Sequence, residues 1–493
     1  MTPSVERIAL APGLEISRVL TGLWQVADME RDGRTLDHAE AARAMAPYAD
    51  AGFTTFDMAD HYGAAEVIAG MFRRDVGPSA PVQCLTKWVP EPGPVTLADA
   101  RAAVDRACAR LQTERIDLMQ FHAWTFADPA WLDALWHLET LRDEGRIGAI
   151  GLTNVDTAHL RIAVASGIRI VSNQVSGSLL DTRFTQKLAP YAAAHGVGLL
   201  CYGTLLGGFL SERWLDAPEP EWETLPTWSQ LKYGRFIRAA GGWSVFQGLL
   251  HAAHAVAQKH AVSLATVASR WVLDQVGVAG VIVGARLGQS AHLADTARVF
   301  ACTLDDDDRQ RIAVAQAACT PIPGDCGDEY RTPPFLTASG DLSHHVSQFP
   351  APFATRRGAD GRTLALSGTV WEPMAGYSRA VRKGNRIHVS GTTATHGSRP
   401  IGGTDPAAQT HFCLDKITGA LQSLGGRLDD VVRTRVFVSQ VHNWEPIARA
   451  HGERFGHILP ANTLVEARLI GDEYLVEIEV DAIVGDDARE DAQ

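Results

Sequence analysis

The sequence has few cysteines, a shortage of positive charge and no long apolar run. Its seven cysteines are scattered without a close Cys-x-x-Cys pair, so we expect reduced thiols and neither a disulfide framework nor a metal site. Lysine and arginine total 45 against 57 acidic residues, and the net charge of −12 would repel a phosphate backbone. No run approaches the roughly 18–20 apolar residues that span a bilayer, and no signal peptide is evident. We therefore expect a cytoplasmic protein that binds neither nucleic acid nor a membrane.

The chain length and the local composition indicate more than one domain. A chain of 493 residues, 46% of them hydrophobic, accommodates two or three domains of roughly 100–200 residues. Around residues 320–360 the sequence becomes rich in proline, glycine and polar residues, which is typical of a linker. We predict an N-terminal domain over 1–335, a linker over 336–361, a smaller α+β domain over 362–486 and a tail over 487–493.

Short apolar runs alternate with helix-like segments through the first 300 residues. This alternation predicts parallel strands joined by helical crossovers, and eight such units close into a (β/α)₈ barrel, the TIM barrel. A doubly wound sheet is the competing architecture, but the first strand runs into Gly22-Leu23-Trp24-Gln25 with no Gly-x-Gly-x-x-Gly turn. The predicted strands lie near 18–23, 53–58, 82–87, 116–121, 147–152, 170–175, 197–202 and 278–283.

Two segments fall outside the regular alternation. Residues 7–16 resemble a small hairpin, which we expect to close the floor of the barrel. Residues 207–245 are too long for an ordinary loop, and long loops on a barrel are often lids. Its aromatic residues would either cover a ligand or pack on one another, and these are Trp214, Trp222, Trp228, Tyr233, Phe236 and Trp243.

Four different titratable side chains follow three consecutive predicted strands. Asp57 and Tyr62 follow the second strand, Lys87 ends the third and His122 follows the fourth. Active sites of parallel barrels lie at these carboxyl ends, and Asp and Lys are rarely buried without a partner. We therefore expect the four side chains to meet at the mouth of the barrel.

This set of groups suits proton delivery to a carbonyl that receives hydride. Tyr62 would donate the proton, and the neighbouring ammonium of Lys87 would lower the pKa of the phenol. Asp57 would keep Lys87 charged, and His122 would donate a hydrogen bond to the carbonyl oxygen. Since no side chain supplies hydride, a nicotinamide cofactor is needed.

Residues 5–330 resemble the aldo-keto reductase superfamily. The segment Asp57-Met58-Ala59-Asp60-His61-Tyr62-Gly63 is similar to the Asp-x-Ala-x-x-Tyr-Gly block of that family, and Lys87 and His122 match its other two catalytic positions. The resemblance implies NAD(P)H-dependent reduction of a small-molecule aldehyde or ketone. It also implies cofactor contacts at Gly22, Trp24, Thr153, Asn154, Gln174, Tyr202, Gly203, Thr204, Leu205, Gly284, Ala285, Arg286 and Gln289.

The same resemblance gives expectations for cofactor choice and for the substrate pocket. Arg286 suits a 2′-phosphate, which favours NADP(H) over NAD(H), although the basic residue often found a few positions later is missing. Trp24, Trp88 and Trp124 would flank the carbonyl, because they follow the first, third and fourth strands.

Residues 365–486 resemble the RidA/YjgF family, which implies a chorismate-mutase-like α+β fold. The segments that carry this resemblance are 376–381, 389–392, 430–434, 460–463 and 475–482. Members form trimers and hydrolyse enamines or imines in clefts between subunits. The matching cleft positions are Tyr377, Ser390, Asn462 and Glu477. Asn462 stands where deaminating members carry an arginine, so the clamp on a substrate carboxylate is missing.

These observations predict an NAD(P)H-dependent oxidoreductase fused to a Rid-like domain. That domain would bind or hydrolyse imines, or would drive assembly into a homo-oligomer such as a trimer. Two alternatives stay open: a binding protein that senses the redox state of its cofactor, and an imine deaminase whose barrel is secondary.

Overall fold

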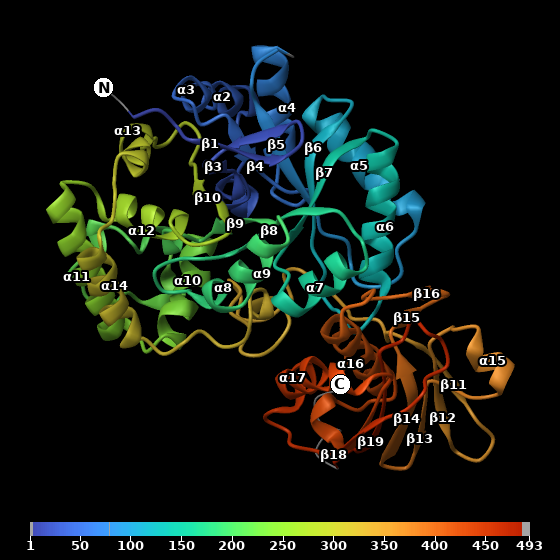
Figure 1. Cartoon of the computed structure of the whole chain (residues 1–493). Helices are drawn as coiled ribbons and strands as arrows, with labels where there is room; N and C mark the ends of the chain where they lie inside the picture. The colour runs from blue at the N-terminus through green and yellow to red at the C-terminus, as the bar shows by residue number, and fades with distance from the viewer. Residues whose placement is uncertain (1–2, 78, 486–493) are drawn as a thin grey trace.

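Eight parallel strands close into a barrel in the N-terminal part of the chain, as predicted (Figure 1). The structure is a computed structural model that describes residues 3–77 and 79–485. Neighbouring strands follow one another around the barrel, and the last pairs with the first. In this order they are β3 (Val19–Gly22), β4 (Thr55–Asp57), β5 (Gln83–Trp88), β6 (Ile116–Phe121), β7 (Ile147–Thr153), β8 (Ile170–Ser176), β9 (Gly198–Tyr202) and β10 (Val278–Gly284).

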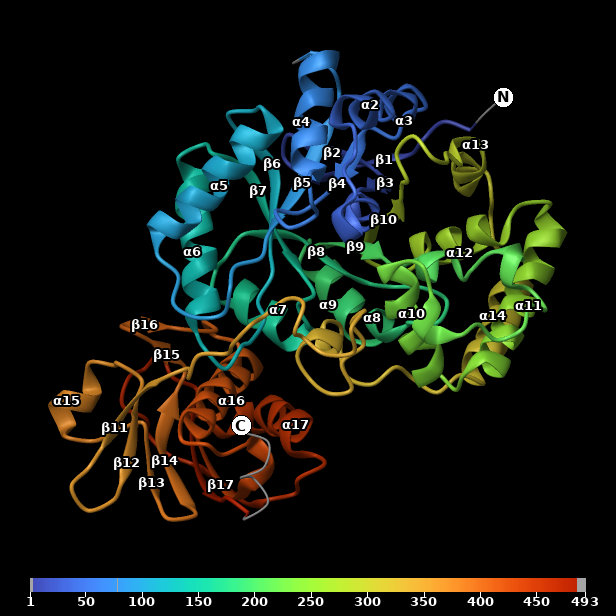
Figure 2. The same ribbon diagram turned by 180° about the vertical axis from the view of Figure 1, so that it is seen from behind.

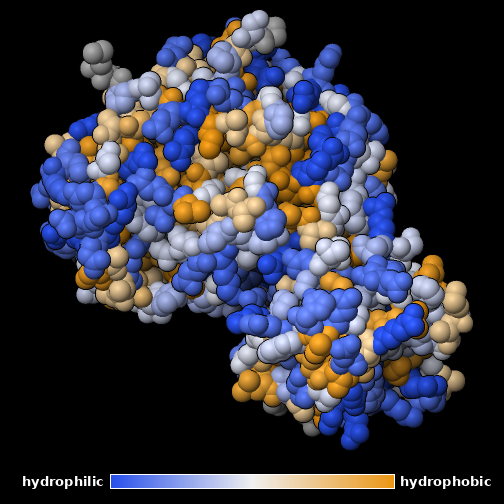
Figure 3. Space-filling view, in the orientation of Figure 1, coloured by the Kyte–Doolittle hydropathy of each residue, from blue (hydrophilic) through white to orange (hydrophobic). Residues whose placement is uncertain are grey.

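Helices surround the barrel because each crossover lays an apolar face on the strands. In the space-filling view, apolar residues gather over the middle of this domain and polar residues prevail on its left edge (Figure 3). The crossover helices are α2 (His38–Arg43), α3 (Ala46–Asp50), α4 (Ala65–Val76), α5 (Leu97–Leu111), α6 (Ala130–Asp143), α7 (Thr157–Ala165), α8 (Arg183–Gln186), α9 (Leu188–Ala194) and α12 (Leu264–Leu273). Further helices are α1 (Trp24–Met29), α10 (Trp228–Ala239), α11 (Trp243–His260), α13 (Leu293–Ala297) and α14 (Asp306–Ala317).

The N-terminal hairpin closes the floor of the barrel. Its strands are β1 (Arg7–Ala11) and β2 (Leu14–Ser17), which pair antiparallel. Leu10 and Leu14 of the hairpin belong to the same buried cluster as Leu85, Leu118 and Leu200 of the barrel strands. Ligands therefore have access to the interior only from the opposite end, where the strands terminate.

The C-terminal part folds around one seven-stranded sheet with helices on one face (Figure 2). The longest helix, α16 (Pro406–Ser423), packs on the two central strands β14 and β19. The sheet order is β11 (Ala354–Arg357), β12 (Thr363–Leu366), β13 (Ala380–Lys383), β14 (Arg386–Thr393), β19 (Val476–Ile483), β17 (Val431–Val438) and β18 (Ala461–Glu466). Shorter elements are α15 (Trp371–Ala375), β15 (Thr395–His396) and β16 (Arg399–Pro400), and α17 (Trp444–Phe455) lies beside α16.

The segment predicted as a linker, 336–361, is held at both ends. The guanidinium of Arg235 in α10 donates to the carbonyl oxygen of Ser339 (3.0 Å), and residues 354–357 form the first strand of the C-terminal sheet. Its proline- and glycine-rich composition gave no sign of these long-range contacts. The tail predicted for 487–493 lies outside the described residues.

A buried charge cluster joins the two parts of the chain. His159 of α7 contacts Asp156 (2.6 Å) on its own side and Asp415 of α16 (3.0 Å) on the other. Arg454 of α17 forms a second ion pair with Asp415. Between two carboxylates, His159 has a raised pKa although burial opposes the charge, and the pKa of Asp415 is lowered chiefly by Arg454 and His159 against the opposing effect of burial.

Further contacts extend this interface along α6 and α7. The ring of His396 is hydrogen-bonded to the carboxylate of Asp133 (2.8 Å) and stacks on the ring of Trp136. The backbone N–H of Gly402 donates to Ser166 (3.0 Å). In both ribbon views α16 lies next to α7 (Figures 1 and 2). None of the helices within 3–77 and 79–485 has the length and apolarity needed to cross a membrane.

We predict that His159→Ala lowers the melting temperature at pH 6 by several degrees, because breaking a buried ion pair costs about 3 kcal/mol. A raised pKa in the folded state stabilises below the unfolded pKa of about 6.5 and is lost as the pH rises through the folded value. The difference in melting temperature between wild type and variant, measured by thermal unfolding, should therefore become smaller toward alkaline pH.

The matched control for this experiment is His457→Ala, which removes an exposed ion pair with Asp429. Surface pairs contribute little, so the control should change the melting temperature by at most about 2 °C. A gap for His159→Ala that stays constant between pH 6 and 10 would contradict the proposed charge on this side chain.

Candidate active site at the mouth of the barrel

One cavity of about 1260 Å³ opens at the carboxyl ends of the barrel strands. It is larger than most sites for a single small molecule and has room for a dinucleotide together with a substrate. It gathers nearly all the residues predicted for the barrel: Gly22, Trp24, Asp57, Tyr62, Lys87, His122, Trp124, Thr153, Asn154, Gln174, Tyr202, Gly203, Thr204, Leu205, Gly284, Arg286 and Gln289.

Trp88 and Ala285 do not line this cavity. Trp88 is buried against Phe121 at a ring separation of 5.7 Å, so its prediction as a substrate-pocket residue is wrong. Successive side chains of a strand point to opposite faces, and Lys87 already faces the interior of the barrel. Ala285 is buried and its N–H donates to Gly22 (2.9 Å).

The buried carboxylate of Asp57 is the centre of the catalytic candidates. One oxygen accepts from Nζ of Lys87 (2.7 Å), and the other accepts from the amides of Gln120 (3.1 Å) and Gln174 (2.8 Å). The carbonyl oxygen of Met58 accepts a second bond from Lys87 (2.9 Å). Because its oxygens are satisfied by donors from three other strands and Lys87 is paired, both charges are tolerated without water.

The ammonium of Lys87 lies beside the phenol of Tyr62 but does not make it acidic. Its nitrogen is 4.9 Å from the centre of the Tyr62 ring. The pKa of Tyr62 nevertheless lies well above its ordinary value, chiefly because of burial and then because of the negative charge of Asp57. The expected lowering of this pKa is thus wrong, since Asp57 offsets the field of the ammonium. Tyr62 is a neutral phenol at physiological pH.

His122 presents a hydrogen-bond acceptor to the cavity. Burial is the main cause that holds its pKa well below the ordinary value, so the ring is neutral and has one N–H. Nδ1 lies 3.3 Å from the carbonyl oxygen of Thr153 and therefore carries that hydrogen. Nε2 is buried and has no partner among the described residues. The expectation that His122 donates to a carbonyl oxygen does not fit this arrangement.

Several of the predicted cofactor-contact side chains meet at the ends of β7, β8 and β9. Asn154 has the left-handed backbone angle φ of 57°, and its side-chain oxygen accepts from the hydroxyl of Tyr202 (2.7 Å). Gln174 directs its amide hydrogens to Asp57 and to Gln120, so its carbonyl oxygen is the atom left for other contacts.

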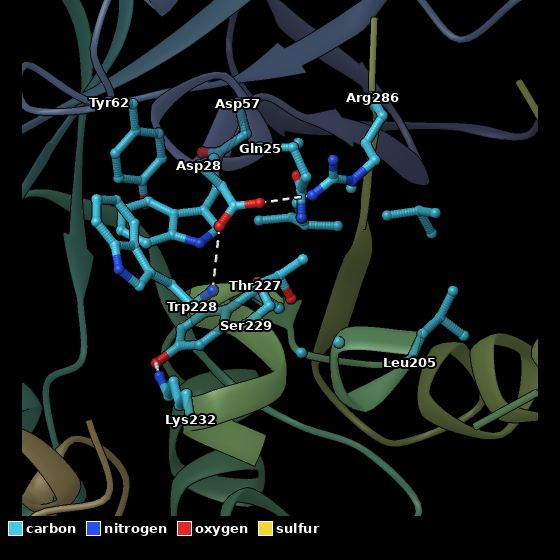
Figure 4. A pocket seen from close by; sticks show the side chains of 18 of the residues that line it. Gln25, Asp28, Asp57, Tyr62, Leu205, Thr227, Trp228, Ser229, Lys232 and Arg286 are labelled. Atoms are coloured by element: carbon cyan, nitrogen blue, oxygen red, sulfur yellow. Dashed lines mark hydrogen bonds and ion pairs between the residues drawn. The ribbon is translucent and has the colours of Figure 1, made fainter. Parts of the chain in front are cut away.

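Asp28 ties the far end of the cavity together. Its carboxylate pairs with Arg286 (2.5 Å) and accepts from the backbone N–H of Trp228 (3.1 Å). Figure 4 shows Asp28 between Arg286 and the first turn of α10. The guanidinium of Arg286, predicted to meet a phosphate, thus already has an acidic partner from α1.

Residues 207–245, the predicted lid, show both of the expected arrangements: some aromatic side chains line the cavity and others pack on one another. Trp228 and Tyr233 line the cavity, and Trp228 lies 5.7 Å from Trp24. Trp214 and Trp222 instead pack around Trp243 on the outer side, at 5.7 and 5.9 Å. Part of the segment therefore covers the cavity and part of it forms a local aromatic core.

A segment beyond the barrel, residues 327–345, supplies wall residues that the sequence did not reveal. Tyr330 approaches His122 at a ring separation of 5.7 Å, and His345 stacks on Trp124 at 5.2 Å. Arg331 fixes the segment by donating to the carbonyl oxygens of Ala123 (2.6 Å) and Asn154 (2.6 Å). Neither motif nor periodicity marks these positions, because their contacts with the strand ends and with α10 join residues far apart in the sequence.

Of the cleft residues predicted for the C-terminal domain, Tyr377, Ser390 and Glu477 lie around Arg379, whereas Asn462 lies apart. Tyr377 accepts from Arg379 (3.0 Å), and Ser390 donates to the backbone of Ser378 (2.9 Å). Asn462 lies in the edge strand β18 and donates to Thr434 of β17 (2.8 Å). Glu477 lies in β19, on the other side of β17. One chain therefore does not bring Asn462 and Glu477 into a single pocket.

Within residues 3–77 and 79–485 no group of three or more His, Cys, Asp or Glu side chains is placed to hold a metal ion.

Comparison with known proteins agrees with the arrangement of both parts. Residues 368–484 match the family model described as endoribonuclease L-PSP. Rv2704 of Mycobacterium tuberculosis, a member of the YjgF/YER057c/UK114 family, is 44% identical over 25% of this chain and 99% of its own, with a TM-score of 0.23. The match of residues 368–484 to this family model supports the RidA/YjgF resemblance seen in the sequence.

The barrel has more distant relatives of nearly the same length. Aldo-keto reductase YhdN of Bacillus subtilis is 25% identical over 345 residues, 65% of this chain and 96% of its own. The glycerol dehydrogenase AKR11B4 of Gluconobacter oxydans shares the barrel fold, with 24% identity, a TM-score of 0.53 and coverage of 66% of this chain and 98% of its own. Residues 18–316, more than half of the chain, match the aldo/keto reductase family model, and the chain therefore belongs to the aldo/keto reductase family.

Proposed function

We propose that the barrel reduces an aldehyde or ketone to an alcohol with a reduced nicotinamide dinucleotide. The observation that supports this most strongly is the meeting of Tyr62, Lys87, Asp57 and His122 on one cavity wall. A protonated phenol beside a paired ammonium is a suitable proton donor to a carbonyl oxygen. Membership of the aldo/keto reductase family supports nicotinamide use.

The residues of the cavity fit such a cofactor. Buried acceptors without a partner in the described part of the chain lie on its wall, at Nε2 of His122 and Oε1 of Gln25. Asn154, Gln174 and Thr153 would hold the carboxamide, and the turn at Gly203–Leu205 would contact the phosphates. When bound, the cofactor would supply the hydride.

Tyr62 would donate its proton to the substrate oxygen. Its high pKa keeps the phenol protonated, and Lys87 at 4.9 Å would stabilise the negative charge that develops on the ring. Nε2 of His122 would accept a hydrogen bond from the new hydroxyl of the alcohol. Asp57 would keep the ammonium in place throughout.

NADP(H) is the preferred dinucleotide in this proposal. Arg286 lies at the end of the cavity away from Tyr62, where its guanidinium would meet a 2′-phosphate (Figure 4). Asp28 weakens the preference by competing for the same guanidinium. The proposal therefore predicts discrimination by Arg286 and opposition by Asp28.

For the C-terminal domain we propose assembly of the chain into a homo-oligomer, such as a trimer, with imine hydrolysis as a second activity. The edge strand β18 is largely exposed and carries Asn462, so a cleft that unites it with Glu477 would be built between copies. Burial, which is opposed by Arg379, and the nearby Glu479 raise the pKa of Glu477, which suits an acid and base for a neutral imine.

Tyr62→Phe should abolish reduction of a panel of aldehydes and ketones, a loss of at least about a hundredfold, while NADPH binding is retained. The assay follows cofactor absorbance, and binding is followed by tryptophan fluorescence. Equal rates in wild type and variant would refute Tyr62 as the proton donor. Tight NADPH binding with no carbonyl reduced by wild type would instead favour a cofactor-sensing binding protein.

Arg286→Gln should weaken NADPH binding by about tenfold or more and leave NADH binding nearly unchanged, since one charge-assisted contact is lost. Titrations of tryptophan fluorescence give both dissociation constants. Arg309→Gln, an exposed arginine of α14, is the matched control. Equal losses for the two dinucleotides would contradict the assigned role.

Glu477→Gln should abolish hydrolysis of imines generated in situ and leave carbonyl reduction by the barrel unchanged. Loss of the negative charge at one acid is expected to cost about a hundredfold in an acid-base step. Hydrolysis that persists in the variant would remove imine chemistry from the proposal, and the molar mass of the chain in solution would then test assembly alone.

A further inference from the structure

Lys232 of α10 is a cation in the wall of the cavity that no catalytic role has used. Its nitrogen lies 4.6 Å from the ring centre of Tyr330 and 4.7 Å from that of Tyr202. It donates to the hydroxyl of Tyr330 (2.7 Å) and, more weakly, to that of Tyr202 (3.4 Å). Within the described residues no carboxylate lies within ion-pair distance of this nitrogen, so its direct contacts are aromatic rings and phenol oxygens.

The nearest acidic side chain is already committed to another cation. Glu329 accepts from Arg183 (3.0 Å) and from the backbone N–H of Gly327 (2.9 Å). Against the effect of burial, the charges of Arg183 and then Lys232 lower the pKa of Glu329, so Glu329 gives the ammonium a counter-charge at a distance without a direct contact. An ammonium has three hydrogens, and two of them are used here, which leaves one for a ligand.

Lys232 and Tyr330 belong to the same end of the cavity as the reacting groups. Tyr330 contacts the ring of His122, and it is one of the groups whose charge raises the pKa of Tyr62. Figure 4 shows Lys232 and Tyr62 toward one side of the cavity, with Arg286 toward the other. Because Tyr330 contacts both the ring of His122 and the ammonium of Lys232, we expect a substrate with its carbonyl at Tyr62 to direct its other end toward Lys232.

Tyr330 belongs to the region of the chain that follows the barrel. The family match ends at residue 316, and Tyr330 is carried by the segment that Arg331 anchors across the strand ends. Its hydroxyl oxygen accepts from Lys232, and its own hydrogen is available to a ligand when the oxygen of Tyr202 does not accept it. A carboxylate would receive that hydrogen together with the third hydrogen of Lys232.

We propose that Lys232 and Tyr330 form a carboxylate-binding subsite, and that the substrate is an aldehyde or ketone that also carries a carboxylate. This inference rests on the proposed reductase function and names its substrate class. The two residues act in specificity, because neither takes part in the proton transfer assigned to Tyr62.

The test compares two aldehydes of nearly equal shape, 4-carboxybenzaldehyde and its neutral methyl ester. With NADPH, wild type should show a kcat/KM at least about tenfold higher for the charged aldehyde. Lys232→Met should lower the kcat/KM for the charged aldehyde by about tenfold to a hundredfold, while the kcat/KM for the ester should change by less than about threefold. Lys232→Arg should restore part of the preference, and Tyr330→Phe should reduce it to a smaller extent.

The control variant is Lys383→Met, which removes an exposed lysine of the C-terminal sheet and should alter neither substrate. Wild type that shows no preference for the charged aldehyde overturns the subsite without any need of a variant. Equal losses for both aldehydes in Lys232→Met also overturn it, because they indicate a structural role.

A binding measurement separates failure of the subsite from failure of the proposed function. Calorimetric titration of the unloaded protein with 4-(hydroxymethyl)benzoate should detect binding in wild type and none in Lys232→Met. If neither aldehyde is reduced but this binding is seen, the subsite stands and the reductase proposal falls. If both aldehydes are reduced but no binding or preference is seen, the reductase proposal stands and the subsite falls.

Discussion

A single buried carboxylate, that of Asp57, organises the interior of the barrel. It receives hydrogen bonds from Lys87, Gln120 and Gln174, which belong to β5, β6 and β8. Without it, a buried ammonium would lack its counter-charge and two buried amides would lack their acceptor. Burial chiefly keeps the pKa of Tyr62 high, and the charge of this carboxylate adds to the effect. One side chain therefore supports the interior of the barrel and contributes to the acid chemistry at its mouth.

The barrel itself was predictable from the sequence, because the signal for each unit is local. All eight strands were found near their observed positions, and the side chains that follow β4, β5 and β6 met as expected. The reason is geometric: in a parallel barrel the strand ends share one rim, so their order in the sequence determines their place in the site. The prediction that Trp88 lines the substrate pocket was wrong, because its neighbour Lys87 points into the barrel and Trp88 therefore points away from it.

Properties that arise from competition between neighbours were not predictable. The sequence places a cation beside Tyr62, but the pKa of the phenol depends on burial and on how fully Asp57 offsets that cation. Lys232 and Tyr330 are 98 positions apart and lie in a lid helix and an irregular segment. No periodicity connects such residues, since only the folded chain determines which irregular segments cross the mouth of the barrel.

The charge cluster around His159 has a consequence for the independence of the two parts. Its ionised members are divided between the halves of the chain, with Asp156 and His159 on one side and Asp415 and Arg454 on the other. If the second half of the chain is deleted, the side chains of Asp156 and His159, which are buried in the full chain, become exposed to solvent. The two parts of the chain therefore depend on each other structurally. Producing the barrel part alone requires redesign of the outer surface of α7 as well as truncation of the chain.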